Sequence, residues 1–371
     1  MKIAFFHNPK AGSASFRVSN VIRQVEAAGN QVRYVSIKDK AWEQAFGEPI
    51  DRAIVAGGDG SVSRLAPWLA ARKLPFCILP LGTANNCARA LGQMHDIETI
   101  KANLRSALIT KIDLGFITAV KDSRSFIESA GIGLLPLFMN EMRALQKENG
   151  AKLRTGPRKR LANARKYLAA LAKNISPFEC ELLVDDEVIK GEFLLLEIAN
   201  AGLIGPRLNL APAADPGDGF FNLVWVSHQR REEWLTYLKL LRKGEESPPP
   251  VEERRCQRIT FCHADAPLHV DGKVFPEVAT PLCISMYQGA LELINFSSLG
   301  RQKRWNFKNR LVTRQRLPTD RSKSHRTIWQ PSGSHTGFMF PSAIAVNFGS
   351  ADKMPSGRRI KSNANGMGHV R

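Results

Sequence analysis

Short apolar runs alternate with amphipathic segments along the first third of the chain. Four runs have the length of buried strands and end in turn residues: 2–8, 31–37, 51–58 and 76–82. Segments 16–30 and 61–73, which lie between them, carry apolar residues at helical spacing. Strands that alternate with helices predict a parallel sheet with helices on its faces.

From about residue 117 the pattern becomes strand-like runs separated by short turns, which favours antiparallel sheet. Two helical stretches interrupt it, a basic one at 145–174 and another at 231–243. After about residue 296 the chain is polar, basic and without periodicity, which is typical of a disordered tail. We therefore expect an α/β fold with two domains, the second β-rich and antiparallel.

Composition adds limits to this picture. The chain has 371 residues, 43% of them hydrophobic and 23% charged, as in soluble globular proteins. Its net charge of +19 is uneven, because residues 301–371 hold 15 basic and 2 acidic side chains. The folded part therefore offers no argument for specific nucleic-acid binding. Six scattered cysteines without a CxxC pair favour reduced thiols and exclude a zinc signature. No apolar run reaches the roughly 20 residues of a membrane span, so we expect a cytoplasmic protein.

Three turns at strand ends are rich in glycine or small residues: "NPKAG" (8–12), "GGDGS" (57–61) and "PLGTANN" (80–86). Open α/β sheets bind ligands beyond the carboxyl ends of their strands, and backbone N–H groups there suit phosphate. The spacing excludes a P-loop and misses the G-x-G-x-x-G of dinucleotide folds. A single turn of this kind is commonly explained by a backbone that requires a positive φ, with no ligand involved. Three such turns at strand ends predict a phosphate-binding edge.

These turns, with the extension "PLGTANNCARALG", resemble the signature turns of the diacylglycerol kinase catalytic-domain family. That family includes bacterial lipid kinases and the sphingosine and ceramide kinases. The similarity continues in the family's order through "DLG" (113–115), "ESAGIG" (128–133), "NLAPAADPGDGFFNLVWV" (209–226) and "HVDGK" (269–273). It covers about residues 1–296.

The resemblance implies a domain organisation. Residues 1–117 would form an ATP-binding domain like that of NAD kinase and phosphofructokinase, and residues 286–297 would rejoin it. Residues 118–297 would form the β-rich domain that binds lipid and metal. Residues 298–371 would be the basic tail, about which the resemblance says nothing.

The resemblance also implies a set of ATP contacts: Asn8, Pro9, Lys10, Ala11, Gly12, Ser36, Gly57, Gly58, Asp59, Gly60, Ser61, Val62, Ser63 and Thr83. It implies a Mg²⁺ site at Asp215, Asp218 and the carbonyl oxygen of Phe220. These are hard oxygen ligands, as Mg²⁺ requires. Read without the family, "DPGDG" is more typical of a tight acidic turn between strands.

Two acidic residues are candidates for catalysis. Asp59 lies in the middle of a phosphate-binding turn, where its charge suits a metal ion or its waters that arrive with the phosphates. The family implies a water network from this aspartate to the metal site of the second domain. Asp271 is the candidate base, within a turn where the family has Asp-Gly-Glu. Here Lys273 stands in the glutamate position, and Asn86 with Cys87 replaces a common Asp-Phe pair.

We expect an ATP- and Mg²⁺-dependent lipid kinase that phosphorylates a hydroxyl of diacylglycerol or a related lipid. Residues 143–173 hold ten basic side chains and one acid, with Leu153, Leu161, Tyr167, Leu168 and Leu171 as an apolar side. Composition alone favours a solvated helix face, but a basic amphipathic segment can also dock an enzyme on anionic lipid. The lipid substrate that the resemblance implies favours docking, so we expect peripheral contact with the inner face of the membrane. Two alternatives stay open: a kinase of the same superfold with a soluble substrate such as NAD, and a catalytically impaired nucleotide-binding regulator.

Overall fold

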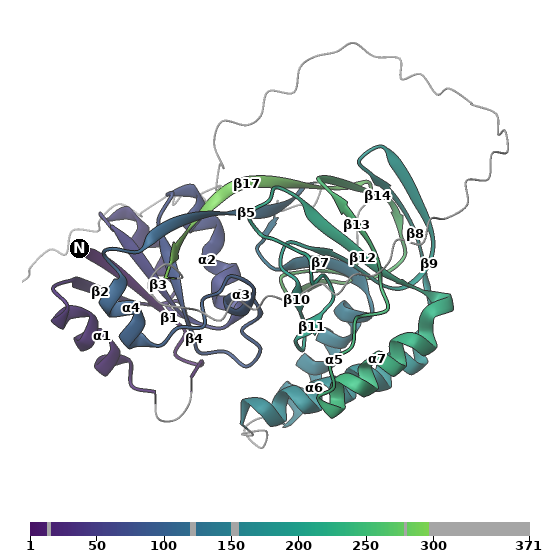
Figure 1. The fold of residues 1–371 in the computed structure, drawn as a ribbon, viewed down its shortest axis with the longest axis horizontal. Helices are drawn as coiled ribbons and strands as arrows, with labels where there is room; N and C mark the ends of the chain where they lie inside the picture. Colours follow the sequence, from purple (N-terminus) through teal and green to yellow (C-terminus); the bar gives the residue numbers. More distant parts are fainter. Residues whose placement is uncertain (13–15, 119–123, 150–155, 278–279, 297–371) are drawn as a thin grey trace, which may run out of the picture. The chain divides into compact units, whose positions relative to one another are not determined.

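The computed structural model describes residues 1–12, 16–118, 124–149, 156–277 and 280–296. The predicted basic tail and Leu153 lie outside these residues. The described part forms one compact unit with a parallel α/β part and a β-rich antiparallel part, as the sequence predicted (Figure 1). In the described part, no helix is long and apolar enough to cross a bilayer, and all six cysteines are free.

The α/β part contains four parallel strands in the order β4-β3-β1-β2. They are β1 (Lys2–His7), β2 (Gln31–Ser36), β3 (Arg52–Gly57) and β4 (Phe76–Pro80). The helical elements are α1 (Val18–Ala27), η1 (Trp42–Gly47), α2 (Asp59–Ala71), α3 (Asn86–Ala90) and α4 (Ile97–Asn103). Each strand and helix predicted for this region is present, and all four strands end at one edge of the sheet.

Side chains alternate across this sheet and build two apolar layers. In β1, Ile3 and Phe5 pack with α1 and α4, whereas Ala4 and Phe6 pack with α2 and η1. All four side chains are at most 1% exposed. Burial on both faces explains why the strand is a continuous apolar run.

The β-rich part is antiparallel. Its strands are β5 (Leu108–Thr118), β6 (Arg124–Phe126), β7 (Ser129–Gly133), β8 (Phe178–Val184), β9 (Glu187–Ala199), β12 (Phe221–Ser227), β13 (Glu252–Cys256), β14 (Arg258–Ala264), β15 (Leu268–Val270), β16 (Lys273–Phe275) and β17 (Leu282–Asn295). A separate small hairpin is formed by β10 (Leu203–Ile204) and β11 (Leu208–Asn209). Helices α5 (Leu134–Asn149), α6 (Pro157–Asn174) and α7 (Arg231–Lys243), with η3 (His228–Arg230), complete it.

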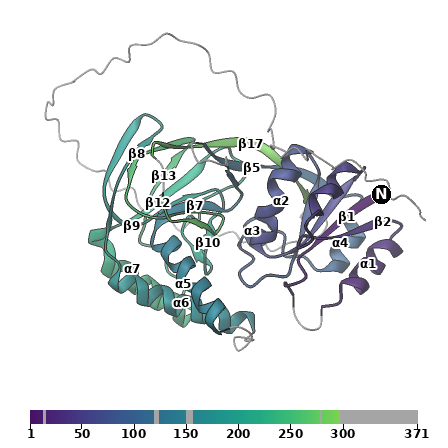
Figure 2. The same ribbon diagram turned by 180° about the vertical axis from the view of Figure 1, so that it is seen from behind.

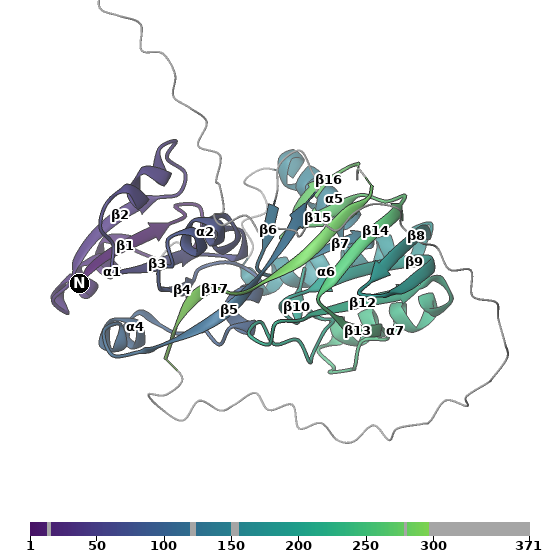
Figure 3. The same cartoon turned by 90° about the horizontal axis from the view of Figure 1, so that it is seen from above.

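One long strand connects the two parts. β17 pairs antiparallel with β14 and β5 and ends beside β4, where Leu293 pairs with Phe76 in parallel (Figure 3). Beyond this pair, Ile294 and Phe296 pack in the same apolar layer as α1 and α4. The chain therefore returns to the α/β part after building the β-rich part.

Helices α5, α6 and α7 lie together against β9 and β12 (Figure 2). The predicted basic stretch 145–174 is not one helix, because Gly156 has a non-helical ψ of 161° and α6 begins after it at Pro157, a residue suited to the first helical position. Its predicted apolar side is also placed differently. Leu161 and Leu168 are buried in the core and Leu171 packs against it, whereas Tyr167 is 44% exposed. Leu161, Leu168 and Leu171 therefore stabilise the fold and do not form an exposed membrane-docking face.

Candidate functional site

The three predicted phosphate-binding turns meet at the carboxyl edge of the parallel strands. The N–H of Gly12 donates to the carbonyl of Leu81 (3.0 Å), and the N–H of Leu81 donates to the carbonyl of Gly57 (2.8 Å). A Cβ atom on Gly82 would lie 2.6 Å from the Cα atom of Gly58. Glycine is required at both positions because the two backbones are nearly in contact.

Other predicted ATP contacts lie within these turns or beside them. Asn8 donates from Nδ2 to Ser61 Oγ (3.4 Å) and accepts the N–H of Lys10 (3.1 Å). Ser36 is buried at the end of β2. Val62 belongs to the apolar core, so its side chain faces away from any ligand, and its backbone is part of α2.

Asp59 begins α2 and faces the start of α3. Its Oδ1 accepts the N–H of Cys87 (3.0 Å), and the N–H groups of Asn85 and Asn86 also bond to this carboxylate. Burial raises the pKa of Asp59, while these backbone donors act to lower it. Helix N-termini stabilise a carboxylate at such a position.

Glu128, between β6 and β7, extends this acidic site from the β-rich part. Its Oε1 accepts Asn86 Nδ2 (3.0 Å), and its Oε2 lies 3.7 Å from Cys87 Sγ. Ligand atoms of Asp59, Cys87 and Glu128 all lie within 4.8 Å of one another. Glu128 was not predicted as a site residue, because "ESAGIG" was interpreted only as a strand and part of the resemblance. An acid directly before a buried, glycine-containing strand was the available signal.

Asp271 contacts the same segment from the other side. Its Oδ1 accepts the N–H groups of Glu128 (2.9 Å) and Ser129 (3.1 Å), and its Oδ2 accepts that of Ile127 (2.9 Å). The side chain of Ser63 also bonds to it. Burial raises the pKa of Asp271, and these hydrogen bonds oppose the rise. Asp271 therefore holds the segment that carries Glu128.

The electrostatics of Glu128 predict a pH-dependent stability. Burial, followed by the charges of Asp59 and Asp271, raises its pKa well above the ordinary value of a glutamate. The native state therefore binds a proton that the unfolded state has lost, so this group's contribution to stability falls as pH rises above about 4.3. In EDTA buffer, Glu128→Gln should gain stability over the parent between pH 5 and pH 8 by on the order of 1 kcal/mol.

Urea unfolding at several pH values measures this difference. Glu187→Gln is the control. Arg254 lowers the pKa of the Glu187 carboxyl, so this substitution should change the pH dependence of stability with the opposite sign. Parallel pH profiles for the Glu128→Gln variant and its parent would contradict the electrostatic explanation.

The predicted metal ligands lie in one turn before β12. Asp215 Oδ1 accepts the N–H of Gly217 (3.0 Å), and Asp218 Oδ1 accepts that of Phe220 (3.0 Å). Two oriented carboxylates in one turn fit the donor chemistry of Mg²⁺. Asp218 Oδ2 is paired with Arg255 Nη2 (2.7 Å), whose guanidinium lies over the ring of Phe220 (3.8 Å). A bound cation would compete with Arg255 for this oxygen.

Asp113, in the "DLG" segment on β5, connects the metal turn to the rest of the site. Its Oδ2 accepts the N–H of Gly219 and its Oδ1 that of Gly289, both at 2.7 Å. Its carbonyl accepts Asn200 Nδ2, which also donates to the carbonyl of Ile127. Protein hydrogen bonds thus lead from the metal turn to the segment held by Asp271. The sequence assigned no role to Asp113 or Asn200.

Lys273 lies two residues after Asp271. It begins β16, its side chain is exposed, and its Nζ lies 5.2 Å from the ring centroid of Phe275.

Comparisons with known proteins find two matching domain families in this chain. Residues 2–117 match the diacylglycerol kinase catalytic domain, and residues 143–295 match the YegS C-terminal NAD kinase beta sandwich-like domain. The chain belongs to the diacylglycerol kinase catalytic-domain family. The resemblance of its three turns is thereby confirmed, as are the α/β fold and the β-rich second part.

This family member has low sequence identity to its relatives, but the similarity extends over most of both chains. It is 26% identical to the diacylglycerol kinase of Bacillus subtilis strain 168 over 251 residues, 64% of this chain and 78% of the relative. It is 27% identical to that of Staphylococcus saprophyticus over 280 residues, 72% and 87% of the two chains. A diacylglycerol kinase structure from Bacillus anthracis shares the fold, with a TM-score of 0.57 and 18% identity over 79% of this chain and 96% of that one.

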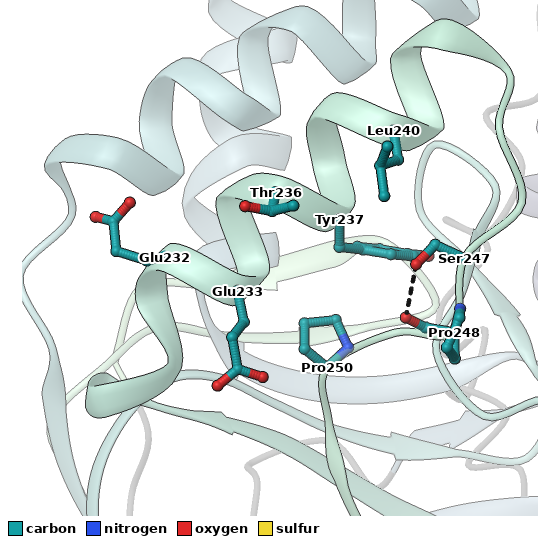
Figure 4. A pocket seen from close by; sticks show the side chains of 8 residues that line it. All are labelled: Glu232, Glu233, Thr236, Tyr237, Leu240, Ser247, Pro248 and Pro250. Atoms are coloured by element: carbon teal, nitrogen blue, oxygen red, sulfur yellow. Dashed lines mark hydrogen bonds between the residues drawn. The ribbon is translucent and has the colours of Figure 1, made fainter.

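A pocket on α7 is separate from this family site (Figure 4). It has a volume of about 360 Å³ and lies between α7 and the loop that follows it. Glu232, Glu233 and Tyr237 line it together with Pro248 and Pro250. No predicted site residue contributes to it, and its two carboxylates would repel phosphate. It is therefore not a candidate for the nucleotide or the metal.

Proposed function

We propose that this family member transfers the γ-phosphate of ATP to a hydroxyl of diacylglycerol or a related lipid. The observation that supports this most is the position of Asp59. It begins a helix at the edge where three phosphate-type turns meet, and it lies beside Glu128 from the β-rich part. An acid at the junction of a nucleotide site and a second part suits phosphoryl transfer between two substrates.

ATP would bind along the three turns. The backbone N–H groups at the start of α2 and the small side chains of the turns leave room for the phosphates. We propose Asn8–Gly12, Ser36, Gly57–Ser63 and Thr83 as the contacts, with Val62 contributing only through its backbone. Mg²⁺, held by Asp215, Asp218 and the carbonyl of Phe220, would supply positive charge that balances the phosphates.

Two carboxylates are proposed for catalysis. Asp271 stays a candidate proton acceptor, although three backbone N–H groups occupy its oxygens. Asp59 is the second candidate, because it belongs to the phosphate-binding turn itself, although the backbone N–H groups of Cys87 and its two neighbours likewise bond to its carboxylate. The raised pKa values of both residues bring them closer to neutral pH, where a general base works best.

The proposed function is tested by transfer of labelled phosphate from ATP, with Mg²⁺, to lipids in mixed micelles. The panel holds diacylglycerol, sphingoid bases, ceramide and phosphatidylglycerol, with NAD as the soluble control. A labelled lipid supports the proposal and identifies the substrate. Labelled NAD would favour the soluble-substrate kinase, and ATP binding without any transfer would favour the regulatory alternative.

We also propose that α6 contacts anionic lipid through charge. Arg158, Lys159 and Arg160 are exposed in its first turn, while its leucines face the core. Each basic residue near an anionic surface contributes about 1 kcal/mol. Replacing all three with glutamine should weaken binding to phosphatidylglycerol vesicles about tenfold or more, as measured by vesicle sedimentation at low salt.

The control removes the same charge from the α/β part by replacing Arg23, Lys38 and Lys40, which are also exposed. That variant should bind vesicles like the parent. Equal losses in both variants would mean that net charge, and not this face, governs the binding.

A further inference from the structure

A hairpin of the β-rich part contacts the predicted ATP turn. β10 contacts α3, and hydrogen bonds join the loop between β10 and β11 to the turn that precedes α3. Arg207 in this loop donates from Nε to the carbonyl of Ala84 and from Nη2 to that of Thr83, both at 2.9 Å. In return, Asn86 Nδ2 donates to the carbonyl of Gly205 (2.9 Å).

Two features of Arg207 make this contact energetically unfavourable by themselves. Arg207 has a φ of +59°, a left-handed conformation that is unfavourable for a residue with a long side chain. Burial, together with the charges of Arg89 and Arg165, lowers the pKa of Arg207, so its surroundings oppose the charged form. The two turn carbonyls compensate for this cost. Arg89, from α3, adds a longer bond to the carbonyl of Ala84 (3.3 Å).

A second arginine, on α6, holds the same loop. Arg165 of α6 donates from Nε to the carbonyl of Pro206 (3.0 Å) and from Nη2 to that of Arg207 (3.3 Å). Its Nη1 donates to the carbonyl of Leu241 in α7 (3.2 Å). The guanidinium of Arg165 thus joins two helices to the loop that carries Arg207. Hydrogen bonds lead without a gap from α6 to Thr83.

We propose that Arg207 is a positioning residue that holds the Thr83–Ala84 turn in its nucleotide-binding conformation, and that Arg165 positions Arg207. The inference rests on the proposed function, because it takes this turn as an ATP contact. The planar fork of a guanidinium fixes two neighbouring carbonyls at once, which a flexible ammonium cannot do. Thermodynamic reciprocity then requires that bound ATP favour the docked hairpin.

The test measures ATP binding by calorimetry and the KM for ATP in the lipid assay. Arg207→Ala should weaken ATP binding and raise the KM for ATP about tenfold, with the KM for lipid and kcat nearly unchanged. Arg207→Lys should recover part of the loss, because one ammonium reaches one carbonyl. Arg165→Ala should act in the same direction, and the double variant should be less impaired than the two single losses combined.

Arg231→Ala is the matched control. Arg231 on α7 also donates to backbone carbonyls, those of Ala172, Lys173 and Ile175, but it does not touch the ATP turn. It should lower the melting temperature and leave ATP binding unchanged. If Arg207→Ala does not fold, Arg207→Lys and Arg165→Ala carry the same test.

The outcomes separate the two claims. Unchanged ATP affinity in the Arg207 variants, or an equal loss in Arg231→Ala, would overturn the positioning role while the kinase activity of the parent still stands. A parent chain that does not bind ATP would overturn the proposed function together with this inference. A raised KM for lipid with normal ATP affinity would show that Arg207 acts on lipid binding, and it would overturn the inference as well.

Discussion

Asp59→Asn is expected to lower the kcat of lipid phosphorylation by about 10³-fold, in the range seen when a positioned acid–base or charged group is removed. The substitution keeps the shape of the side chain, and its amide oxygen can still accept the N–H of Cys87. It removes the negative charge at the start of α2. ATP binding should therefore persist, since the backbone of the three turns carries it. Calorimetry and the labelled-phosphate assay measure the two quantities separately.

Two further variants make this result specific. Asp186→Asn, at an exposed carboxylate in the turn between β8 and β9, should leave the rate unchanged. Lys273→Ala should also retain the rate within about threefold, because the Lys273 side chain is exposed. A tenfold or greater gain in Lys273→Glu would instead assign the proton acceptor to position 273 and contradict the role of Asp59.

Asp113→Asn is expected to lower the free energy of unfolding by about 3 kcal/mol. The Asp113 side chain is 2% exposed, and each of its oxygens accepts a different backbone N–H. An amide replaces one of these acceptors with a donor, so the N–H of Gly219 or of Gly289 faces an NH₂ group. A buried donor left without a partner costs about 1–3 kcal/mol, and a lost charge-assisted bond adds to this.

Asp185→Asn provides the matched control for urea unfolding. A single oxygen of Asp185 accepts the N–H groups of both Gln257 (3.2 Å) and Arg258 (3.0 Å). An asparagine oxygen can accept both bonds, and asparagine tolerates the left-handed conformation found at this residue. The expected loss is below about 1 kcal/mol. Equal losses at positions 113 and 185 would show that the two-sided hydrogen bonding of Asp113 is not what stabilises the fold.

Local sequence patterns by themselves determined several strands, the glycine turns and the family of this protein. Apolar runs of strand length predicted β1, β3 and β4 closely, because strands buried on both faces need continuous apolar sequence. The glycines of the turns predicted the edge where those strands end, since no other residue allows Gly58 and Gly82 to approach so closely. The same turns identified the family.

Only the tertiary structure decided which distant residues complete the site. Glu128 reaches Asn86 across 42 positions, and Arg207 reaches Ala84 across 123, so no local pattern could pair them. The leucines of α6 have the spacing of a membrane-docking helix, but burial against α7 and β9 decided that they face the core. Periodicity shows that a helix has an apolar side; the partner that covers that side is determined by the fold.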